Sequence, residues 1–162
     1  ILNLEKSGDF YDIATMVQGD EPLVSHKIID QITNALITNK NISCANGFGS
    51  LFKDELKNKN CVKVIKDVFD NAIYMSRQEI PFNAKPYINV GKQIAVIPFK
   101  TDFLKLYSGL KETPLEIAES IDMLRLIEHG YQIKMVKVKG FLHPVDTLED
   151  VKIVEEYLIK SN

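Results

Sequence analysis

Val17-Gln18-Gly19-Asp20-Glu21-Pro22 is the stretch around which the rest of the chain can be organised. It closes a run of apolar and β-branched residues that begins at Tyr11, and its glycine and proline are typical of a turn. The pattern predicts a buried strand that ends in an acidic turn. In open α/β sheets ligands bind beyond the carboxyl ends of the strands, so Asp20 and Glu21 are expected to face such a crevice. Acidic turn residues are also commonly just solvated, so this stretch alone leaves both interpretations open.

The composition indicates one globular domain that covers residues 1–162. The chain has 162 residues, of which 45% are hydrophobic, enough for one ordinary core. With 20 basic and 22 acidic residues the net charge is −2, and no dense Lys/Arg cluster predicts binding to nucleic acid or to a membrane. Cys44 and Cys61 form no CxxC motif, so buried, reduced thiols in a cytoplasmic protein are expected. No apolar run reaches the length of a membrane span, and the first residues do not resemble a secretory signal.

Helix and strand patterns alternate outward from the acidic turn. Residues 1–6 are typical of the last turns of a helix, and Ser25 can cap a helix that runs to about Thr38. The further expected elements are a strand over 42–45, a hairpin of strands 61–66 and 72–76, an irregular crossing over 81–91, a strand over 92–99, helices over 101–108 and 113–128, a strand over 131–138, and a helix over 147–160. This order predicts a mixed α/β sheet with helices on both faces, with the hairpin as a projecting arm or an edge element.

Two further segments bear on function. The glycines of Asn46-Gly47-Phe48-Gly49-Ser50 suggest a phosphate-binding loop, but no lysine follows at the spacing of a P-loop, and a turn is expected instead. Asp146 lies just after the last strand and at the start of the last helix, where it is either a ligand or a plain helix cap. Carboxylates converging from Asp20 and Asp146 would suit Mg²⁺, which takes one or two protein carboxylates together with water and substrate phosphates. The candidate chemistry is therefore nucleotidyl transfer.

Several motifs recur in a fixed order across nearly the whole chain. They are Val17–Leu23, Val62–Val64, Tyr74–Arg77 with Ile80-Pro81, Thr113–Glu116, Glu119–Arg125 and Val145–Asp150. In this order and spacing they resemble the CMP-sugar synthetase family, and most closely its 3-deoxy-manno-octulosonate (KDO) cytidylyltransferases. The resemblance implies a nucleotidyltransferase-like (Rossmann-like) α/β fold and a homodimer.

The resemblance also implies roles for individual residues. Asp20 and Asp146 would be the catalytic magnesium ligands, and Gln18 would contact the sugar acid. Arg77 would face the carboxylate of that acid, for which a guanidinium is a natural partner, although an ordinary surface arginine is the alternative. Asp122 occupies the position of a family glutamate that faces the sugar hydroxyls.

The sequence departs from the KDO enzymes around the sugar. Gln93 stands in the place of a histidine, Ile97 near that of a tyrosine, and Met123 in that of a glutamine. We therefore expect Gln93 among the substrate contacts, in a pocket with fewer polar groups, and a sialic or legionaminic type of nonulosonic acid is an alternative acceptor. His143 lies three residues before Asp146, but an exposed loop histidine without a role is the simpler expectation.

The family's glycine- and arginine-containing nucleotide loop has no counterpart before Tyr11, and the chain does not begin with Met. We therefore expect a single nucleotidyltransferase domain without its N-terminal third, inactive by itself. The complete protein is expected to join CTP to KDO or a related sugar acid with Mg²⁺, giving a CMP-sugar and pyrophosphate for surface polysaccharide such as lipopolysaccharide. A non-catalytic dimerisation or sugar-binding remnant is the alternative outside enzymes.

Overall fold

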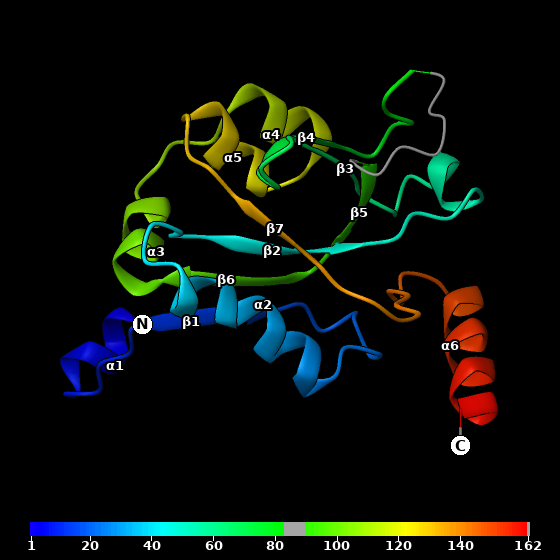
Figure 1. Cartoon of the computed structure of the whole chain (residues 1–162), viewed down its shortest axis with the longest axis horizontal. Helices are drawn as coiled ribbons and strands as arrows, with labels where there is room; N and C mark the ends of the chain where they lie inside the picture. Colours follow the sequence, from blue (N-terminus) through cyan, green and yellow to red (C-terminus); the bar gives the residue numbers. More distant parts are fainter. Residues whose placement is uncertain (83–89, 162) are drawn as a thin grey trace.

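Two sheets form the framework of the computed structural model, which describes residues 1–82 and 90–161 (Figure 1). The larger sheet has the order β4 (Ala72–Ser76), β3 (Lys63–Lys66), β5 (Val90–Ile94), β2 (Ala45–Gly49) and β7 (Lys134–Lys137). The β2–β7 pair is parallel and the other pairs of this sheet are antiparallel. The smaller sheet pairs β1 (Ile13–Val17) with β6 (Val96–Lys100), also antiparallel. The expectation of a mixed α/β sheet is therefore confirmed.

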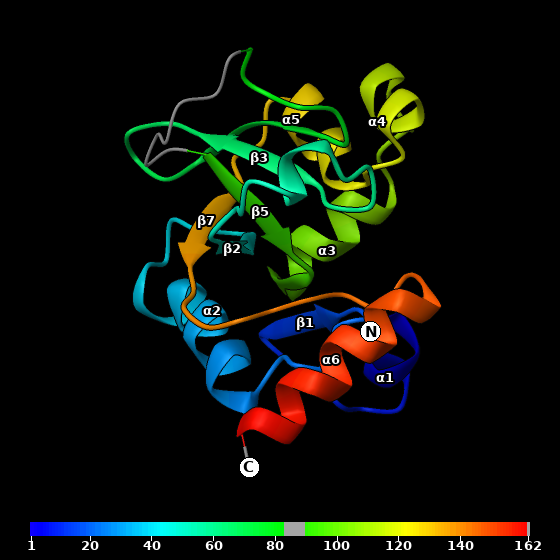
Figure 2. The same cartoon turned by 90° about the vertical axis from the view of Figure 1, so that its right-hand side faces the viewer.

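Helices cover both faces of the larger sheet, as the sequence predicted. On one face α2 (His26–Thr38) buries Ile32 and Leu36 against Ala45 of β2 and Val96 of β6. The helices α3 (Thr101–Ser108), α4 (Pro114–Glu119) and α5 (Met123–Glu128) belong to the other side, where Leu124 and its neighbours form a second core. In both views α2 and β1 lie on one side of the larger sheet and α4 and α5 on the other (Figures 1 and 2). The remaining elements are α1 (Leu2–Lys6), the short 3₁₀ helix η1 (Glu55–Lys57) and α6 (Leu148–Ser161).

The strand before the acidic turn is less buried than the sequence predicted. Met16 and Val17 are 39% and 40% exposed. The reason is topological, because among the described strands β1 pairs only with β6. Its apolar, β-branched composition therefore indicated a strand correctly but not its burial.

The prediction of a turn at residues 46–50 was wrong, because β2 occupies this place and is entirely buried. Its glycines are required by close packing and not by a turn. A Cβ atom on Gly47 would lie 2.8 Å from the Cβ of Ile94, and one on Gly49 would lie 2.9 Å from the Cδ1 of the same residue. Glycine inside a strand commonly marks such a close approach.

The strand predicted over 92–99 is in fact two strands that belong to different sheets. The change occurs at Ala95, between β5 and β6. Its N–H donates to Glu21 Oε1 (3.1 Å) and its carbonyl oxygen accepts from the N–H of Gln18 (3.1 Å). The acidic turn thus satisfies the backbone groups that a continuous ladder would otherwise have used. It is also fixed directly against the point where the chain changes sheets.

The helix predicted over 113–128 is likewise divided, into α4 and α5. Ser120 ends α4 in the left-handed conformation, with φ of 54°. The expected start is correct, since Thr113 is the N-cap, Pro114 follows it, and the Thr113 N–H donates to Glu116 Oε2 (3.2 Å). The break matters for function because it turns Ser120 and Asp122 towards the same cavity.

The predicted hairpin is confirmed, since β3 and β4 pair antiparallel. Of its two expected placements, the structure has the edge of the sheet, because β3 also pairs with β5 and β4 is the outermost strand. Most of the irregular crossing expected over 81–91 lies outside the described residues. Within the described part of the chain, no helix combines the length and apolar character needed to cross a membrane.

Candidate active site

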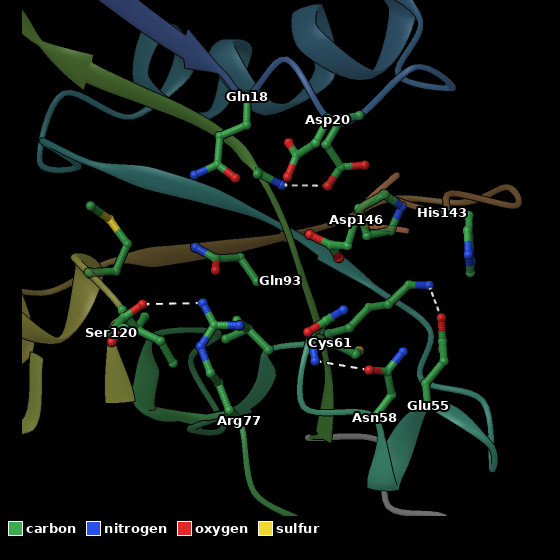
Figure 3. A pocket seen from close by; sticks show the side chains of 18 of the residues that line it. Gln18, Asp20, Glu55, Asn58, Cys61, Arg77, Gln93, Ser120, His143 and Asp146 are labelled. Carbon is green, nitrogen blue, oxygen red and sulfur yellow. Dashed lines mark hydrogen bonds and ion pairs between the residues drawn. The ribbon is translucent and has the colours of Figure 1, made fainter. Parts of the chain in front are cut away.

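A polar cavity of about 170 Å³ lies where the acidic turn, the end of β4, the α4–α5 break and the segment before α6 meet (Figure 3). All the site residues predicted from the sequence line it: Gln18, Asp20, Arg77, Gln93, Asp122 and Asp146. Figure 3 shows Asp20 and Asp146 towards one end of the cavity, Arg77 and Ser120 towards the other, and Gln93 between them. The structure therefore brings together residues that are more than one hundred positions apart in the sequence.

The acidic end of the cavity is built by a contact between distant segments. The N–H of Val145 donates to the backbone carbonyl oxygen of Asp20 (2.8 Å), which places Asp146 beside the acidic turn. Burial raises the pKa of Glu21, and the charges of Asp20 and Asp146 raise it further. Burial also raises the pKa of Asp146, with the charge of Asp20 adding to the effect. The charge of Asp20 thus adds to the raised pKa of two neighbouring carboxyl groups, Glu21 and Asp146.

These carboxylates fit a hard divalent cation. Within residues 1–82 and 90–161, Asp20 Oδ1 and Glu21 Oε2 are buried without a hydrogen-bond partner. The N–H of Asp150 in the first turn of α6 donates to Thr147 Oγ1 (3.3 Å), and no described residue donates to the carboxylate of Asp146, so Asp146 does not act as the helix cap that was its alternative. The described residues contain no group of three or more His, Cys, Asp or Glu side chains arranged as a metal site. A cation that needs only one or two protein carboxylates and fills its remaining positions with water and phosphate, as Mg²⁺ does, suits this donor set better than zinc.

Arg77 supplies the positive charge at the opposite end. Its Nε and the two terminal nitrogens donate to the backbone carbonyl oxygens of Glu119 (3.0 Å), Lys59 (3.1 Å) and Ser120 (3.3 Å). In the described part of the chain no carboxylate forms an ion pair with it. The guanidinium is therefore held in position by neutral groups while its charge stays available for an anionic ligand. This half-buried arrangement is not that of an ordinary surface arginine.

Glu119 fixes the strand end that carries this arginine. Its carboxylate accepts from Ser76 Oγ (2.6 Å), the Arg77 N–H (2.9 Å) and Tyr74 Oη (3.1 Å). Burial opposes ionisation of Glu119, but these hydrogen bonds together outweigh it and lower the pKa of the carboxyl below its ordinary value. The sequence placed Glu119 in a motif without assigning it this role.

A buried lysine that the sequence did not identify holds another wall of the cavity. Lys63 is completely buried, and its Nζ donates to the carbonyl oxygens of Asn58 (2.7 Å), Arg77 (2.7 Å) and Cys61 (2.9 Å). Burial lowers the pKa of this amine. All three acceptor residues line the cavity. The only signal in the sequence was a lysine between valines in a predicted strand, Val62-Lys63-Val64.

A second buried lysine connects two loops at the rim. Lys92 is 4% exposed, forms an ion pair with Glu55, and donates to the carbonyl oxygen of Leu142 (2.9 Å). It therefore joins the segment around η1 to the segment that leads to Asp146. Its charge also lowers the pKa of Glu21, against the larger effect of burial.

The expectation that His143 is exposed was wrong. It is half-buried, lines the cavity, and its Nε2 lies 2.7 Å from Asp150 Oδ1. Asp150 also accepts from the N–H of Thr147 (2.8 Å) and of Asp146 (3.2 Å), so it organises the start of α6. His143 therefore belongs to the group of residues that holds Asp146 in place.

Both cysteines are buried and free of disulfide bonds, as expected. Cys61 lines the cavity, and burial raises the pKa of its thiol to about 11. The thiolate is the reactive form of cysteine, so Cys61 is a poor nucleophile at neutral pH. The cavity consequently offers carboxylates, amides and a guanidinium for binding, but no activated nucleophile of its own.

The fold and this cavity define a nucleotidyltransferase. A structure of CMP:2-keto-3-deoxy-manno-octonic acid synthetase in complex with CTP is 25% identical with a TM-score of 0.85, covering 99% of this chain and 67% of that one. The structure of the inositol-1-phosphate CTP transferase of T. maritima is 15% identical, with a TM-score of 0.61. The match covers 95% of this chain and 58% of that chain, and it shows a shared fold alone. The predicted Rossmann-like nucleotidyltransferase class is confirmed.

Within that class the chain belongs to the cytidylyltransferase family, which its sequence matches over residues 4–138. A 3-deoxy-manno-octulosonate cytidylyltransferase of Fusobacterium nucleatum is 39% identical over 154 residues, which cover 94% of this chain. The resemblance drawn from the sequence motifs is therefore confirmed. The chain spans 63% of the length of that relative.

Proposed function

We propose that this chain forms the sugar-acid side and part of the metal site of a Mg²⁺-dependent cytidylyltransferase. The complete enzyme would join CTP to a 3-deoxy-2-keto sugar acid, KDO or a relative, and release pyrophosphate. One observation carries the proposal: the carboxylates of Asp20 and Asp146 and the guanidinium of Arg77, which within residues 1–82 and 90–161 forms no ion pair, line the same cavity. A phosphate-bound cation and an acidic sugar are the ligands that this charge pattern suits.

Asp20 and Asp146 would hold the cation from two segments that the hydrogen bond between Val145 and Asp20 keeps together. Mg²⁺ bound there would neutralise negative charge on the nucleotide phosphates and lower the pKa of the attacking hydroxyl. Arg77 would bind the carboxylate of the sugar acid. Because its three backbone partners fix its plane, it would orient the anomeric hydroxyl towards the acidic end of the cavity.

Gln18, Gln93 and Asp122 would contact the hydroxyls of the sugar, since they line the cavity between these charged ends. Ile97 and Met123, at positions where the KDO enzymes carry polar side chains, also line the cavity. They would leave part of the acceptor without a polar partner. The precise sugar acid is therefore a matter for direct comparison between acceptors.

The experiment is pyrophosphate release by the full-length protein from CTP with KDO and a panel of sialic and legionaminic acids. Substitution Asp146→Asn or Asp20→Asn should reduce turnover about 100-fold or more and weaken the dependence on Mg²⁺, since loss even of outer groups at metal sites costs 10- to 100-fold. Asp30→Asn, on the exposed face of α2, is the matched control and should be near normal. Near-normal turnover by Asp146→Asn would refute the metal assignment, and turnover of a nonulosonic acid alone would change the acceptor.

We further propose a homodimer that acts in the cytoplasm and supplies a CMP-sugar for surface polysaccharide. The support is the family resemblance of the sequence motifs, together with the use of CTP as donor. Light scattering of the full-length protein tests the dimer. Absence of turnover with every acceptor would favour the non-catalytic alternative.

A further inference from the structure

Two amide side chains are hydrogen-bonded to each other across the middle of the larger sheet. Asn46 on β2 is completely buried, and Gln93 on the neighbouring β5 lines the cavity. Gln93 Nε2 lies 2.7 Å from Asn46 Oδ1. Gln93 can contact a ligand in the cavity with either end of its amide, the amino group or the oxygen.

The orientation of both amides follows from the backbone around them. Asn46 Nδ2 lies 2.7 Å from the carbonyl oxygen of Ile94 and 3.3 Å from that of Gly47. Carbonyl oxygens only accept hydrogen bonds, so the amino group of Asn46 must face them and its oxygen must face Gln93. Gln93 must in turn donate to that oxygen. Its amino group is therefore directed into the sheet.

The oxygen of Gln93 is left for the cavity. Within the described residues no group donates to Gln93 Oε1, and this atom is not among the buried atoms that lack a partner. It is therefore accessible. In Figure 3 the oxygen lies on the side of Arg77 and Ser120, away from the acidic end. At this point the cavity presents a hydrogen-bond acceptor beside a fixed cation.

We propose that Asn46 is a positioning residue that locks the amide of Gln93, so that Gln93 selects sugar acids with a hydroxyl donor next to their carboxylate-binding end. The proposal rests on the proposed function and adds to it the polarity of one sugar contact. An unlocked glutamine could turn either its amino group or its oxygen towards a ligand, whereas this one offers only the oxygen. A sugar acid without that hydroxyl would bind poorly, because it would displace water from Gln93 Oε1 without supplying a hydrogen-bond donor in its place.

A double-mutant cycle in the full-length protein separates positioning from a structural role. Asn46→Ala and Gln93→Ala are each expected to lower kcat/KM for the preferred sugar acid about tenfold, the usual scale for one lost hydrogen bond. The double variant should also be about tenfold lower, because Asn46 acts only through Gln93. KM for CTP should not change. If the kcat/KM of the double variant is about 100-fold lower, the effect of Asn46→Ala persists without Gln93, and the proposal is overturned.

Acceptor analogues give a second readout that needs no Asn46 variant. Deoxyfluoro sugar acids replace each hydroxyl in turn by a group that cannot donate. For the wild type, one such analogue should have a kcat/KM about tenfold lower than that of the unmodified sugar acid. For Gln93→Ala, the kcat/KM of the same analogue should be no more than about twofold lower than that of the unmodified sugar acid. If no position behaves in this way, Gln93 Oε1 is not an acceptor for the substrate.

Hydrogen exchange of side-chain amides in the wild type tests the lock itself. The amide protons of Gln93 should exchange with solvent at least tenfold more slowly than those of Gln78, which is exposed. Equal rates overturn the lock. A wild type inactive with every sugar acid overturns the proposed function and this inference with it, whereas an active wild type with additive variants overturns this inference alone.

Discussion

Replacing Glu21 by glutamine should make the protein more stable at alkaline pH. Glu21 is 7% exposed, and its Oε1 accepts from the Ala95 N–H while its Oε2 has no partner among the described residues. Glutamine retains the accepting oxygen and the shape of the side chain but removes the charge. Its amino group would take the place of Oε2, beside the carboxylates of Asp20 and Asp146, where a donor is favourable and a third negative charge is not.

The expected gain is about 1–3 kcal/mol in the free energy of unfolding, the usual cost of one buried, unsatisfied polar group. The pH dependence has a definite sign. Burial raises the pKa of Glu21 in the folded protein above its ordinary 4.5, so the folded state binds more protons than the unfolded state between these two values. Wild-type stability must therefore fall as the pH rises through this window, and the glutamine variant lacks that loss. The difference should be near zero below pH 4.5 and constant above the raised pKa.

Urea unfolding of full-length wild type and Glu21→Gln, followed by circular dichroism in EDTA between about pH 4.5 and pH 8, measures this difference. Glu155→Gln on the exposed part of α6 is the control and should change stability by less than about 0.5 kcal/mol at every pH. Adding Mg²⁺ should narrow the gap in stability between the two proteins, because a cation bound by Asp20 and Asp146 would offset the charge of Glu21, which only the wild type carries. A variant that is less stable at pH 8, or a difference that does not grow with pH, would refute the reasoning.

Substitutions at three further positions test the supports of the cavity. Glu119→Ala removes the acceptor of three hydrogen bonds and should lower the free energy of unfolding by about 2–4 kcal/mol in urea, with a raised KM for the sugar acid because the strand end carrying Arg77 is released. Lys63→Met leaves three carbonyl oxygens without their donor and should cost about 2–4 kcal/mol by the same measurement, and an unchanged midpoint would contradict its role. Ser120→Gly should be neutral or stabilising by up to about 1 kcal/mol in thermal unfolding, whereas Ser120→Val should cost about 1–2 kcal/mol, because φ is 54° there.

The sequence was most informative where a local pattern has one structural solution. The sequence correctly predicted α2, and the structure buries Ile32 and Leu36 of this helix in the core, because a helix with that apolar spacing has only one face to bury. Asp20 and Asp146 were expected to converge because polar side chains that follow strands meet at the same edge of an α/β fold, and both line the same cavity. The other predicted site residues, Gln18, Arg77, Gln93 and Asp122, came from the family resemblance, and they line that cavity as well.

The errors have a common physical origin in contacts that the local sequence does not contain. The glycines of β2 look like turn residues, but they exist because Ile94 approaches the strand closely. The division of β5 from β6 depends on Glu21, more than seventy residues earlier, which takes over the N–H of Ala95. The end of α4 at Ser120 is marked by neither glycine nor proline. Burial of Lys63 among three carbonyl oxygens contradicts the usual exposure of lysine, and its place between two valines was the only local sign of that burial.

Lys63 holds the wall of the cavity in a way that does not depend on the side chains of that wall. Its ammonium group binds only main-chain oxygens, and every amino acid supplies a main-chain oxygen. The side chains at positions 58 and 61 can therefore be substituted while Lys63 keeps its hydrogen bonds to the main chain of that loop. Mutation can therefore change the side chains that face the cavity while the loop keeps its path. A single buried lysine thus leaves this part of the cavity wall free to vary in sequence without losing its shape.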